Sequence, residues 1–422
     1  MSKFTGYRCS ICSAEYLPGQ VTYTCPKDGG NLDVELDYKA LKKKYHYEDI
    51  TSRDDFSLWR YEPLLPVSEP KGEATPLHLA GWTPVFKLPR LAEKLGLDHL
   101  WLKDESRNPS ASFKDRASAI VVARAQELKS EIIVTASTGN AGAALACMSA
   151  AIGQKAIIFA PKSAPPAKVS QLLVFGAQVI LVDGTYDDAF DLTVKAADEF
   201  GWYCRNTGYN PFTVEGKKTA AFEIWEWWIE AHRDWHQKDS PLDNHPPLTV
   251  FVSVGDGNII SGIHKGFKDL VKLGWIPNMP RIIGVQAEGS AAIANAFNAN
   301  TEIITPVSAT TLADSISVDL PRDGVRAVRA AKETNGTYIT VSDSEILEAI
   351  PELGKMGVFA EPAGAAAYAG LVKAVSNGVV RSDDPVLVMN TGSGLKDVKA
   401  AMQAVHAAPI IEPTLEAVKK LL

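Results

Sequence analysis

The sequence predicts an α/β protein whose two domains contain twisted, mostly parallel sheets flanked by helices. Two observations carry this prediction. A chain of 422 residues is too long for one compact hydrophobic core, so two domains are expected. Short apolar and β-branched runs alternate with helical periodicities along most of the chain, and such alternation is typical of parallel sheets with helices on both faces.

The first half of this alternation starts after Trp82. Residues 100–102 form the first expected strand, and the spacing of Ala117, Val121 and Ala125 predicts a helix behind Lys114. Further strands are expected at 131–136, 155–160 and 178–182, and further helices at 143–150, 169–175 and 187–200. Residues 118–205 are therefore expected to form a small domain with its own parallel sheet.

The second half repeats the pattern, with strands expected at 250–254, 282–286, 338–341 and 386–389. Ser342 and Glu345 have the spacing of a capping box and predict a helix through Ile350. Residues 237–247 contain three prolines and no periodicity, which predicts an inserted surface loop. An aromatic cluster at 222–228 favours core or subunit packing over ligand binding, because indole rings bury large areas.

Composition excludes several classes of function. The net charge of −7 and the lack of a basic block argue against a nucleic-acid partner. No apolar run reaches membrane-spanning length, and the N-terminus lacks the apolar core of a signal peptide, so no membrane association is expected. Five cysteines do not form a secreted disulfide framework, and a cytoplasmic location is expected.

The first 36 residues have the cysteine spacing of a zinc ribbon. Cys9 and Cys12 form a Cys-x-x-Cys pair, and Cys25 follows after twelve intervening residues. Two such pairs would present four ligands at tetrahedral corners, but Asp28 occupies the place of the fourth cysteine. Two interpretations stay open: a structural Zn²⁺ site of three thiolates and one carboxylate, or a ribbon-shaped remnant held by its hairpins.

One segment, residues 108–116, is a candidate for covalent chemistry. Asn108 and Pro109 keep its start irregular, and Ser112 is the expected N-cap of the following helix. Lys114 is then packed against the core near the positive end of the helix dipole, where its neutral amine is favoured. A neutral amine can attack an aldehyde, which pyridoxal 5′-phosphate offers to lysines. The alternative is an exposed lysine in an ordinary loop.

Three further loops join a strand to a helix and combine glycine with hydroxyl or amide groups. They read Ser137-Thr138-Gly139-Asn140, Ser253-Val254-Gly255-Asp256-Gly257-Asn258 and Asn390-Thr391-Gly392-Ser393-Gly394. Backbone amides at such helix starts bind anions, and glycines let these amides converge on a phosphate. Each loop alone also fits a capped or glycine-rich turn without a ligand.

Taken together, these segments resemble the threonine synthase family, which belongs to the fold type II pyridoxal-phosphate enzymes. Residues 108–116 resemble the segment whose lysine carries the cofactor, and the three loops resemble later motifs of the family in the same order. The resemblance covers nearly the whole chain. It implies a tryptophan synthase β-like fold with a zinc-ribbon-like segment at 1–36, a large cofactor-binding domain at 37–117 and 206–422, and a small substrate-binding domain at 118–205.

The resemblance also implies roles for individual residues. It assigns contacts with pyridoxal 5′-phosphate to Lys114, Phe113, Asn140, Gly255, Gly257, Asn258 and Thr391. It assigns contacts with the substrate to Ser137, Thr138, Asn206 and Thr207. Thr391 would hydrogen-bond the pyridine nitrogen, and a neutral hydroxyl there suits elimination and replacement more than transamination.

Residues 206–219 resemble the family segment that contacts the phosphate of O-phosphohomoserine. Thr213 stands where the family has an arginine, so a neutral hydroxyl replaces a charged fork. Residues 315–321 lack a second basic contact of the family. The first hypothesis is threonine synthase activity. The alternatives are an ammonia-lyase acting on threonine or serine, a β-replacing synthase similar to cysteate synthase, and a binding protein without activity. A small amino-acid substrate and a homodimer are expected.

Overall fold

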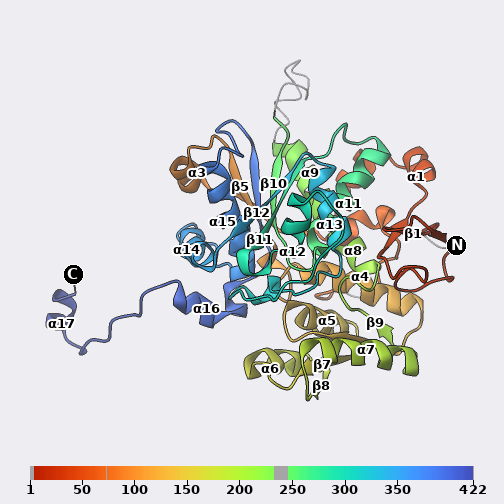
Figure 1. The fold of residues 1–422 in the computed structure, drawn as a ribbon, viewed down its shortest axis with the longest axis horizontal. Helices are drawn as coiled ribbons and strands as arrows, with labels where there is room; N and C mark the ends of the chain where they lie inside the picture. Colours follow the sequence, from red (N-terminus) through yellow and green to blue (C-terminus); the bar gives the residue numbers. More distant parts are fainter. Residues whose placement is uncertain (1–3, 73, 232–245, 422) are drawn as a thin grey trace.

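The computed structural model describes residues 4–72, 74–231 and 246–421. These residues form three sheets, and Figure 1 shows the largest sheet in the upper part of the body and the second sheet, with its helices, below it. After α16 (Val398–Gln403) the chain extends away from the body to α17 (Leu415–Lys419) (Figure 1). Within the described residues, no helix is both long enough and apolar enough to cross a membrane.

The largest sheet has six strands in the order β12-β11-β10-β13-β5-β4. All neighbouring strands are parallel except the edge strand β4, which is antiparallel to β5. The strands are β4 (Val85–Lys87), β5 (Leu100–Asp104), β10 (Thr249–Ser253), β11 (Arg281–Ala287), β12 (Thr337–Val341) and β13 (Val386–Asn390). The five expected strands are confirmed, whereas the three-residue β4 was not predicted.

Both faces of this sheet are covered, because alternate residues of each strand enter different cores. Val250 and Val252 of β10 pack in one core, and Phe251 packs in the opposite one. The first core contains residues of α9 (Thr219–Ala231), α11 (Asn258–Leu273), α12 (Ala292–Asn298) and α13 (Gly324–Lys332). The second contains residues of α3 (Pro89–Leu95), α14 (Asp343–Gly354) and α15 (Pro362–Ser376). The aromatic cluster on α9 packs in the first core, as expected.

The second sheet has four parallel strands in the order β8-β7-β6-β9. They are β6 (Ile132–Ala136), β7 (Lys155–Pro161), β8 (Gln178–Val182) and β9 (Tyr203–Cys204). The associated helices are α5 (Asn140–Ala151), α6 (Pro166–Val174) and α7 (Tyr186–Phe200). Ile133 and Ile158 face one core, and Val134 and Ile157 face the other, so helices cover both faces as predicted.

The N-terminal sheet consists of β1 (Gly6–Cys9), β2 (Glu15–Tyr16) and β3 (Leu32–Glu35). It packs against α8 (Phe212–Lys217), where the Phe4 ring lies 5.6 Å from the Phe212 ring. Asn31 Nδ2 donates a hydrogen bond to the Gly208 carbonyl at 2.6 Å. This small sheet therefore supports the segment 208–217. Two short helices follow it, α1 (Tyr38–Lys44) and α2 (Glu48–Thr51).

One predicted cap is wrong. The helix α4 (Lys114–Glu127) has Phe113 as its N-cap, and the Ser112 side chain does not cap it. Instead, the backbone of Ser112 pairs with Gly392, which follows β13. The capping box of Ser342 and Glu345 is confirmed. Most of the loop expected at 237–247 lies outside the described residues.

Candidate active site

Lys114 is the first residue of α4 and lines a cavity of about 730 Å³. This cavity lies beyond the carboxyl ends of β6, β10 and β13, where ligands of open α/β sheets commonly bind. The three strand-to-helix loops selected from the sequence therefore meet at one place. Ser137, Thr138 and Asn140 line the cavity together with Lys114. So do Gly255, Gly257, Asn258 and Thr391.

The backbone around Lys114 is held by distant segments. The Phe113 N–H donates to the Thr391 carbonyl at 2.9 Å, which ties the start of α4 to the loop after β13. Asp115 accepts hydrogen bonds from the N–H and the hydroxyl of Ser110, and this closes the loop before the helix. Phe113 itself is buried in a hydrophobic core and is not among the residues that line the cavity.

The environment of Lys114 favours its neutral amine. Burial lowers the pKa of Lys114, and the positive charge of Arg205 lowers it further. The carboxylates of Glu361 and Asp256 oppose this shift without reversing it. The side chain is half-buried because it faces the cavity. The neutral amine expected from the sequence is therefore favoured by the structure.

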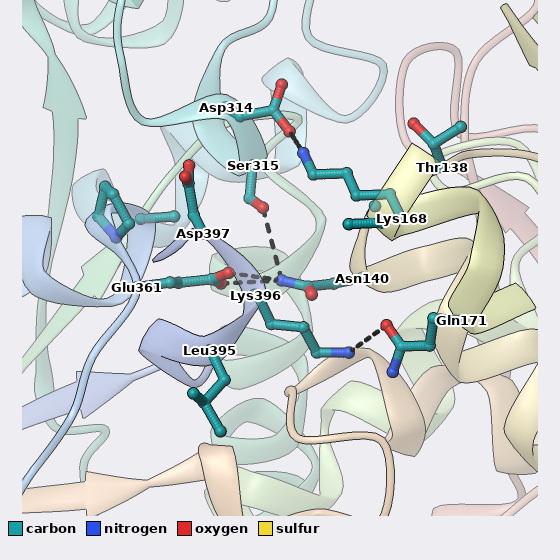
Figure 2. Close-up of a pocket in the computed structure, with 14 residues that line it drawn as sticks. Thr138, Asn140, Lys168, Gln171, Asp314, Ser315, Glu361, Leu395, Lys396 and Asp397 are labelled. Carbon is teal, nitrogen blue, oxygen red and sulfur yellow. Dashed lines mark hydrogen bonds and ion pairs between the residues drawn. The ribbon is translucent and has the colours of Figure 1, made fainter. Parts of the chain in front are cut away.

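Asn140 and Glu361 form a buried contact in the wall of a smaller pocket that shares residues with the cavity (Figure 2). Asn140 Nδ2 donates to the two carboxylate oxygens of Glu361 at 2.8 and 3.0 Å. It also lies 3.4 Å from the Ser315 hydroxyl. Burial raises the pKa of Glu361. The sequence analysis did not predict Glu361 as a site residue, although a carboxylate directly before Pro362 at the start of a helix is visible in the sequence.

The loop before α11 needs glycine for steric reasons. Gly257 has a φ of +86°, and a Cβ there would lie 2.6 Å from the Asp323 carbonyl oxygen. A Cβ on Gly255 would lie 2.8 Å from the Ile316 Cα. Asp256 lines the cavity, accepts from the Arg322 N–H at 3.3 Å, and has a pKa that burial raises. The bare backbone thus leaves its amides open to an anion at the start of the helix.

Some residues of the segment after β9 line the cavity, and others hold the neighbouring backbone in place. Thr207 lines the cavity, but Asn206 does not. The Asn206 side chain accepts hydrogen bonds from the Thr135 hydroxyl at 3.0 Å and the Ala136 N–H at 2.8 Å, so it fixes the end of β6. Thr213 is fully buried, outside the lining, and donates to the Asn210 carbonyl at 2.8 Å. Lys217, one helical turn later, lines the cavity.

Comparison with known proteins identifies the family. A model of the pyridoxal-phosphate dependent enzyme family matches residues 77–392. The threonine synthase of Methanocaldococcus jannaschii is 36% identical over 419 residues, which cover 98% of each chain. The chain belongs to the threonine synthase family of pyridoxal-phosphate-dependent enzymes. The threonine synthase of Methanosarcina acetivorans is 35% identical with the same coverage.

Solved structures of this class share the fold of the chain. The processed form of threonine deaminase isoform 2 from Solanum lycopersicum superposes with a TM-score of 0.64 at 21% identity. The match covers 81% of this chain and 92% of that chain. A diaminopropionate ammonia lyase from Escherichia coli also gives a TM-score of 0.64, over 85% of this chain and 95% of that chain at 21% identity. The predicted fold type II architecture is confirmed.

Membership of this family makes pyridoxal 5′-phosphate the cofactor, and the residues of the cavity fit it. Lys114 offers an amine whose pKa is lowered, as covalent attachment to an aldehyde requires. The start of α11 offers backbone amides beside two glycines that leave no side chain in the way. Lys217 adds a cation to the same wall.

The four residues of the predicted metal site are close together. One ligand atom from each of Cys9, Cys12, Cys25 and Asp28 lies within 4.8 Å of the others. The Cys9 thiol lies 3.3 Å from Asp28 Oδ1, and the sulfurs of Cys12 and Cys25 are 3.7 Å apart. Three thiols and one carboxylate could hold Zn²⁺ in a tetrahedral site. The cluster lies in the N-terminal sheet, and none of its members lines the cavity.

Proposed function

We propose that the chain converts O-phosphohomoserine and water into threonine and phosphate. The observation that carries the proposal is the 36% identity to a threonine synthase over 98% of both chains. A cavity that combines a lysine of lowered pKa with three polar strand-to-helix loops is consistent with this reaction. The enzyme is then a pyridoxal-phosphate-dependent lyase.

Lys114 is the proposed catalytic residue. When bound, pyridoxal phosphate supplies an electron sink for the amino acid attached to it. The Lys114 amine takes and returns protons at Cα and Cβ, and its lowered pKa favours the neutral form that accepts a proton. Phosphate leaves from Cγ, and water then adds at Cβ to give threonine. Ser137 and Thr138 bind the substrate carboxylate in this proposal, since they line the cavity at the start of α5.

The remaining predicted contacts are proposed as follows. Gly255, Gly257 and Asn258 hold the cofactor phosphate, Thr391 contacts the pyridine nitrogen, and Asn140 faces the ring oxygen, all from the wall of the cavity. Asn206 and Phe113 support the site through their backbone neighbours, which is a narrower role than direct contact. Thr207 contacts the substrate.

The second candidate is an ammonia-lyase acting on threonine or serine, which needs only loss of the β-substituent. The observation that favours it is Thr213, a neutral residue where the family has its phosphate-binding arginine. A β-replacing synthase similar to cysteate synthase is a third option on the same ground. None of these alternatives changes the role of Lys114.

The deciding experiment incubates the holoenzyme separately with O-phosphohomoserine, threonine and serine. Release of inorganic phosphate with formation of threonine supports the proposal. Formation of a 2-oxo acid from threonine or serine, without phosphate release from O-phosphohomoserine, would replace it with the ammonia-lyase. The absorbance band of bound cofactor, and its loss on borohydride treatment, checks that the protein is loaded.

We also propose the organisation of the protein in the cell. A division into a ribbon at 1–36, a large domain at 37–117 and 206–422 and a small domain at 118–205 is supported by three separate sheets. A homodimer is supported by the exposed apolar side chains of the C-terminal segment, such as Ile410 and Leu415. A cytoplasmic location is supported by five free thiols among the described residues. Light scattering of the purified enzyme tests the dimer.

A further inference from the structure

Buried cations of this chain are, with few exceptions, paired with carboxylates. Arg60 lies 2.6 Å from Glu226, Lys103 2.7 Å from Glu223, and Arg116 2.7 Å from Glu105. Lys218 lies 2.6 Å from Glu215, and Arg326 2.6 Å from Asp323. The partly exposed Lys168, which lines the cavity, also pairs with a carboxylate, that of Asp314 (Figure 2). This pairing is expected, because an unpaired buried charge is costly.

Lys217 and Arg205 are the exceptions among the buried lysines and arginines of the described residues. Both side chains are fully buried, and neither has a carboxylate within ion-pair distance in the part of the chain that the structure describes. Within the described residues, the Lys217 ammonium donates only to Asn258 Oδ1, a neutral amide. Arg205 donates to the hydroxyls of Ser118 at 3.2 Å and Thr207 at 2.6 Å, and its Nη2 has no hydrogen-bond partner in the described part of the chain.

These two cations are directed to one wall of the cavity. Lys217 lines it directly, beside Asn258 at the start of α11. Arg205 lies behind Thr207, which also lines the cavity. A guanidinium only donates, so the Thr207 oxygen accepts from it and the Thr207 proton is free to be donated elsewhere. The cavity wall therefore presents an ammonium and a hydroxyl donor, with a second positive charge behind them.

We propose that Lys217 and Thr207 bind a phosphate monoester in the cavity, and that Arg205 is a positioning residue that orients Thr207. The identity of the monoester rests on the proposed function: it is either the phosphate of O-phosphohomoserine or the phosphate of the cofactor itself. Both are dianions, and a dianion supplies the counter-charge that the two cations lack.

The proposal also explains how the chain manages without the arginine of its family. Thr213 and Lys217 are one turn apart on α8, and both side chains reach the same oxygen of Asn258. They therefore lie on one face of the helix. The cation missing at 213 is present at 217, and the short hydroxyl of Thr213 leaves room for the lysine. The positive charge therefore lies one helical turn further along the same face of α8.

Two titrations test the site without relying on turnover. Inorganic phosphate is titrated into the holoenzyme by calorimetry, and pyridoxal phosphate is titrated into the apoenzyme by absorbance. The variant Lys217→Gln keeps an amide donor toward Asn258 and removes the charge. Loss of one charge-assisted bond predicts roughly 10- to 100-fold weaker binding in one of the titrations. Lys268→Gln, on the exposed side of α11, removes a lysine outside the cavity and should change neither.

The two titrations distinguish a site for the substrate phosphate from a site for the cofactor phosphate. Weaker binding of inorganic phosphate to the holoenzyme assigns the site to the substrate, and weaker binding of pyridoxal phosphate assigns it to the cofactor. Unchanged affinity in both titrations, for a variant with a normal melting temperature, overturns the proposal. If the wild type binds phosphate through Lys217 but does not turn over O-phosphohomoserine, the proposed function fails and the anion site stands.

Three further variants sharpen the test. Lys217→Arg should bind within a few-fold of the wild type, and the double variant Thr213→Arg with Lys217→Gln should recover the affinity that Lys217→Gln alone loses. Thr207→Val should weaken phosphate binding, whereas Thr207→Ser should not. Arg205→Gln should weaken binding in the wild-type background and have no further effect in Thr207→Val. An additive effect in that last pair would show that Arg205 does not act through Thr207.

Discussion

The chain contains two groups of buried cations, one paired with carboxylates and one without such partners among the described residues. In the first, Lys103 and Arg116 share the carboxylates of Glu105 and Glu223, and all four side chains are nearly inaccessible to solvent. In the second, Lys217 lines the cavity and Arg205 lies behind it, and neither has a carboxylate within ion-pair distance among the described residues. A buried charge without a partner costs stability, so its presence indicates a ligand that completes it.

The paired group also shows how the fold fixes the site. Glu223, on α9, accepts from the Trp82 N–H at 2.8 Å and from the Lys103 amine at 2.7 Å. It also accepts from Arg116, two residues after Lys114 on α4. Three other segments, at Trp82, Lys103 and Glu223, are thereby tied to the first turn of α4. The paired charges fix the backbone around the site, whereas the unpaired charges of Lys217 and Arg205 are the ones proposed to act on a bound phosphate.

The largest effect is expected at Lys114, the cavity amine that is the proposed catalytic residue. Lys114→Ala should abolish covalent attachment of the cofactor and lower turnover, with loss of the acid–base role alone worth roughly 10²–10⁴-fold. The melting temperature of the apoenzyme should stay close to that of the wild type, since Lys114 pairs with no carboxylate among the described residues. Absorbance and a single-turnover assay measure both points. A variant that retains the cofactor band after borohydride and reacts at the wild-type rate would remove Lys114 from the site.

The next largest effect is expected when the paired group loses one of its carboxylates. Glu223→Gln leaves Lys103 and Arg116 with Glu105 as their shared carboxylate, and removing one partner from a buried ion pair costs about 3–5 kcal/mol of unfolding free energy. Urea unfolding of the variant and the wild type measures this difference. Glu416→Gln, in an exposed pair with Lys419, is the matched control and should leave the unfolding midpoint unchanged. Equal behaviour of the two variants would contradict the structural role of Glu223.

The same carboxylate predicts an acid limit of stability. Burial acts to raise the pKa of Glu223, but the charges of Arg116 and Lys103 outweigh it and hold the pKa at about 2, below the ordinary 4.5. The stabilisation is therefore complete above pH 4.5 and is lost as the pH falls toward 2. Between about pH 5 and pH 3, the unfolding free energy should fall more steeply for the wild type than for Glu223→Gln. Parallel pH profiles would show that other groups set the acid limit.

The comparison also separates what could be predicted from sequence. Strands such as β10 and β13 follow from continuous apolar runs, and the glycine-containing loops lie between a strand and a helix, so local pattern was enough to place them. The cap at Ser112 was wrong because its backbone pairs with Gly392, 280 positions away in the numbering. A long-range contact of this kind overrides a local preference and leaves no local trace.

The same limit applies to the site. Glu361 and Asn140 meet across 221 positions, and no periodicity links them. Thr213 was selected because of its position in a motif, yet the cavity is lined by Lys217, one turn further along the helix. Which face of α8 meets the cavity depends on how the helix packs, and the sequence of the helix alone does not fix that. The lack of an ion-pair partner for Arg205 among the described residues is likewise a property of the tertiary structure.

The cluster of Cys9, Cys12, Cys25 and Asp28 is a third group of ionisable side chains, and a metal ion is its predicted partner. If Zn²⁺ is bound by Cys9, Cys12, Cys25 and Asp28, its binding free energy is part of the folding free energy of the N-terminal sheet. Incubation with a chelator should then lower the melting temperature, by roughly 1 °C for each kcal/mol lost in a chain of 422 residues. Cys12→Ser should remove this sensitivity. Metal analysis that finds no zinc in protein purified without chelator would leave the segment as a ribbon-shaped remnant.

The smallest expected effect is the stability of Lys217→Gln, and it bears most directly on the comparison. Burial lowers the pKa of Lys217 well below its ordinary value, and the nearby charges of Lys114 and Arg205 add to the shift. Without phosphate, the lysine therefore contributes no favourable ion pair, and glutamine keeps a donor for Asn258 Oδ1. The unfolding free energy should stay within about 1 kcal/mol of the wild type or rise slightly, in contrast to Glu223→Gln.

Added phosphate should make the wild type more stable than Lys217→Gln. The dianion completes the charge at Lys217, so the wild type should gain more melting temperature from saturating phosphate than Lys217→Gln does. Calorimetric melting of both proteins, with and without phosphate, gives the four values needed. A loss of 3–5 kcal/mol in Lys217→Gln without phosphate would place Lys217 with the structural cations, on the scale expected for a broken buried pair. Its isolation from carboxylates would then reflect packing alone, and the distinction between the two groups of charges would not hold.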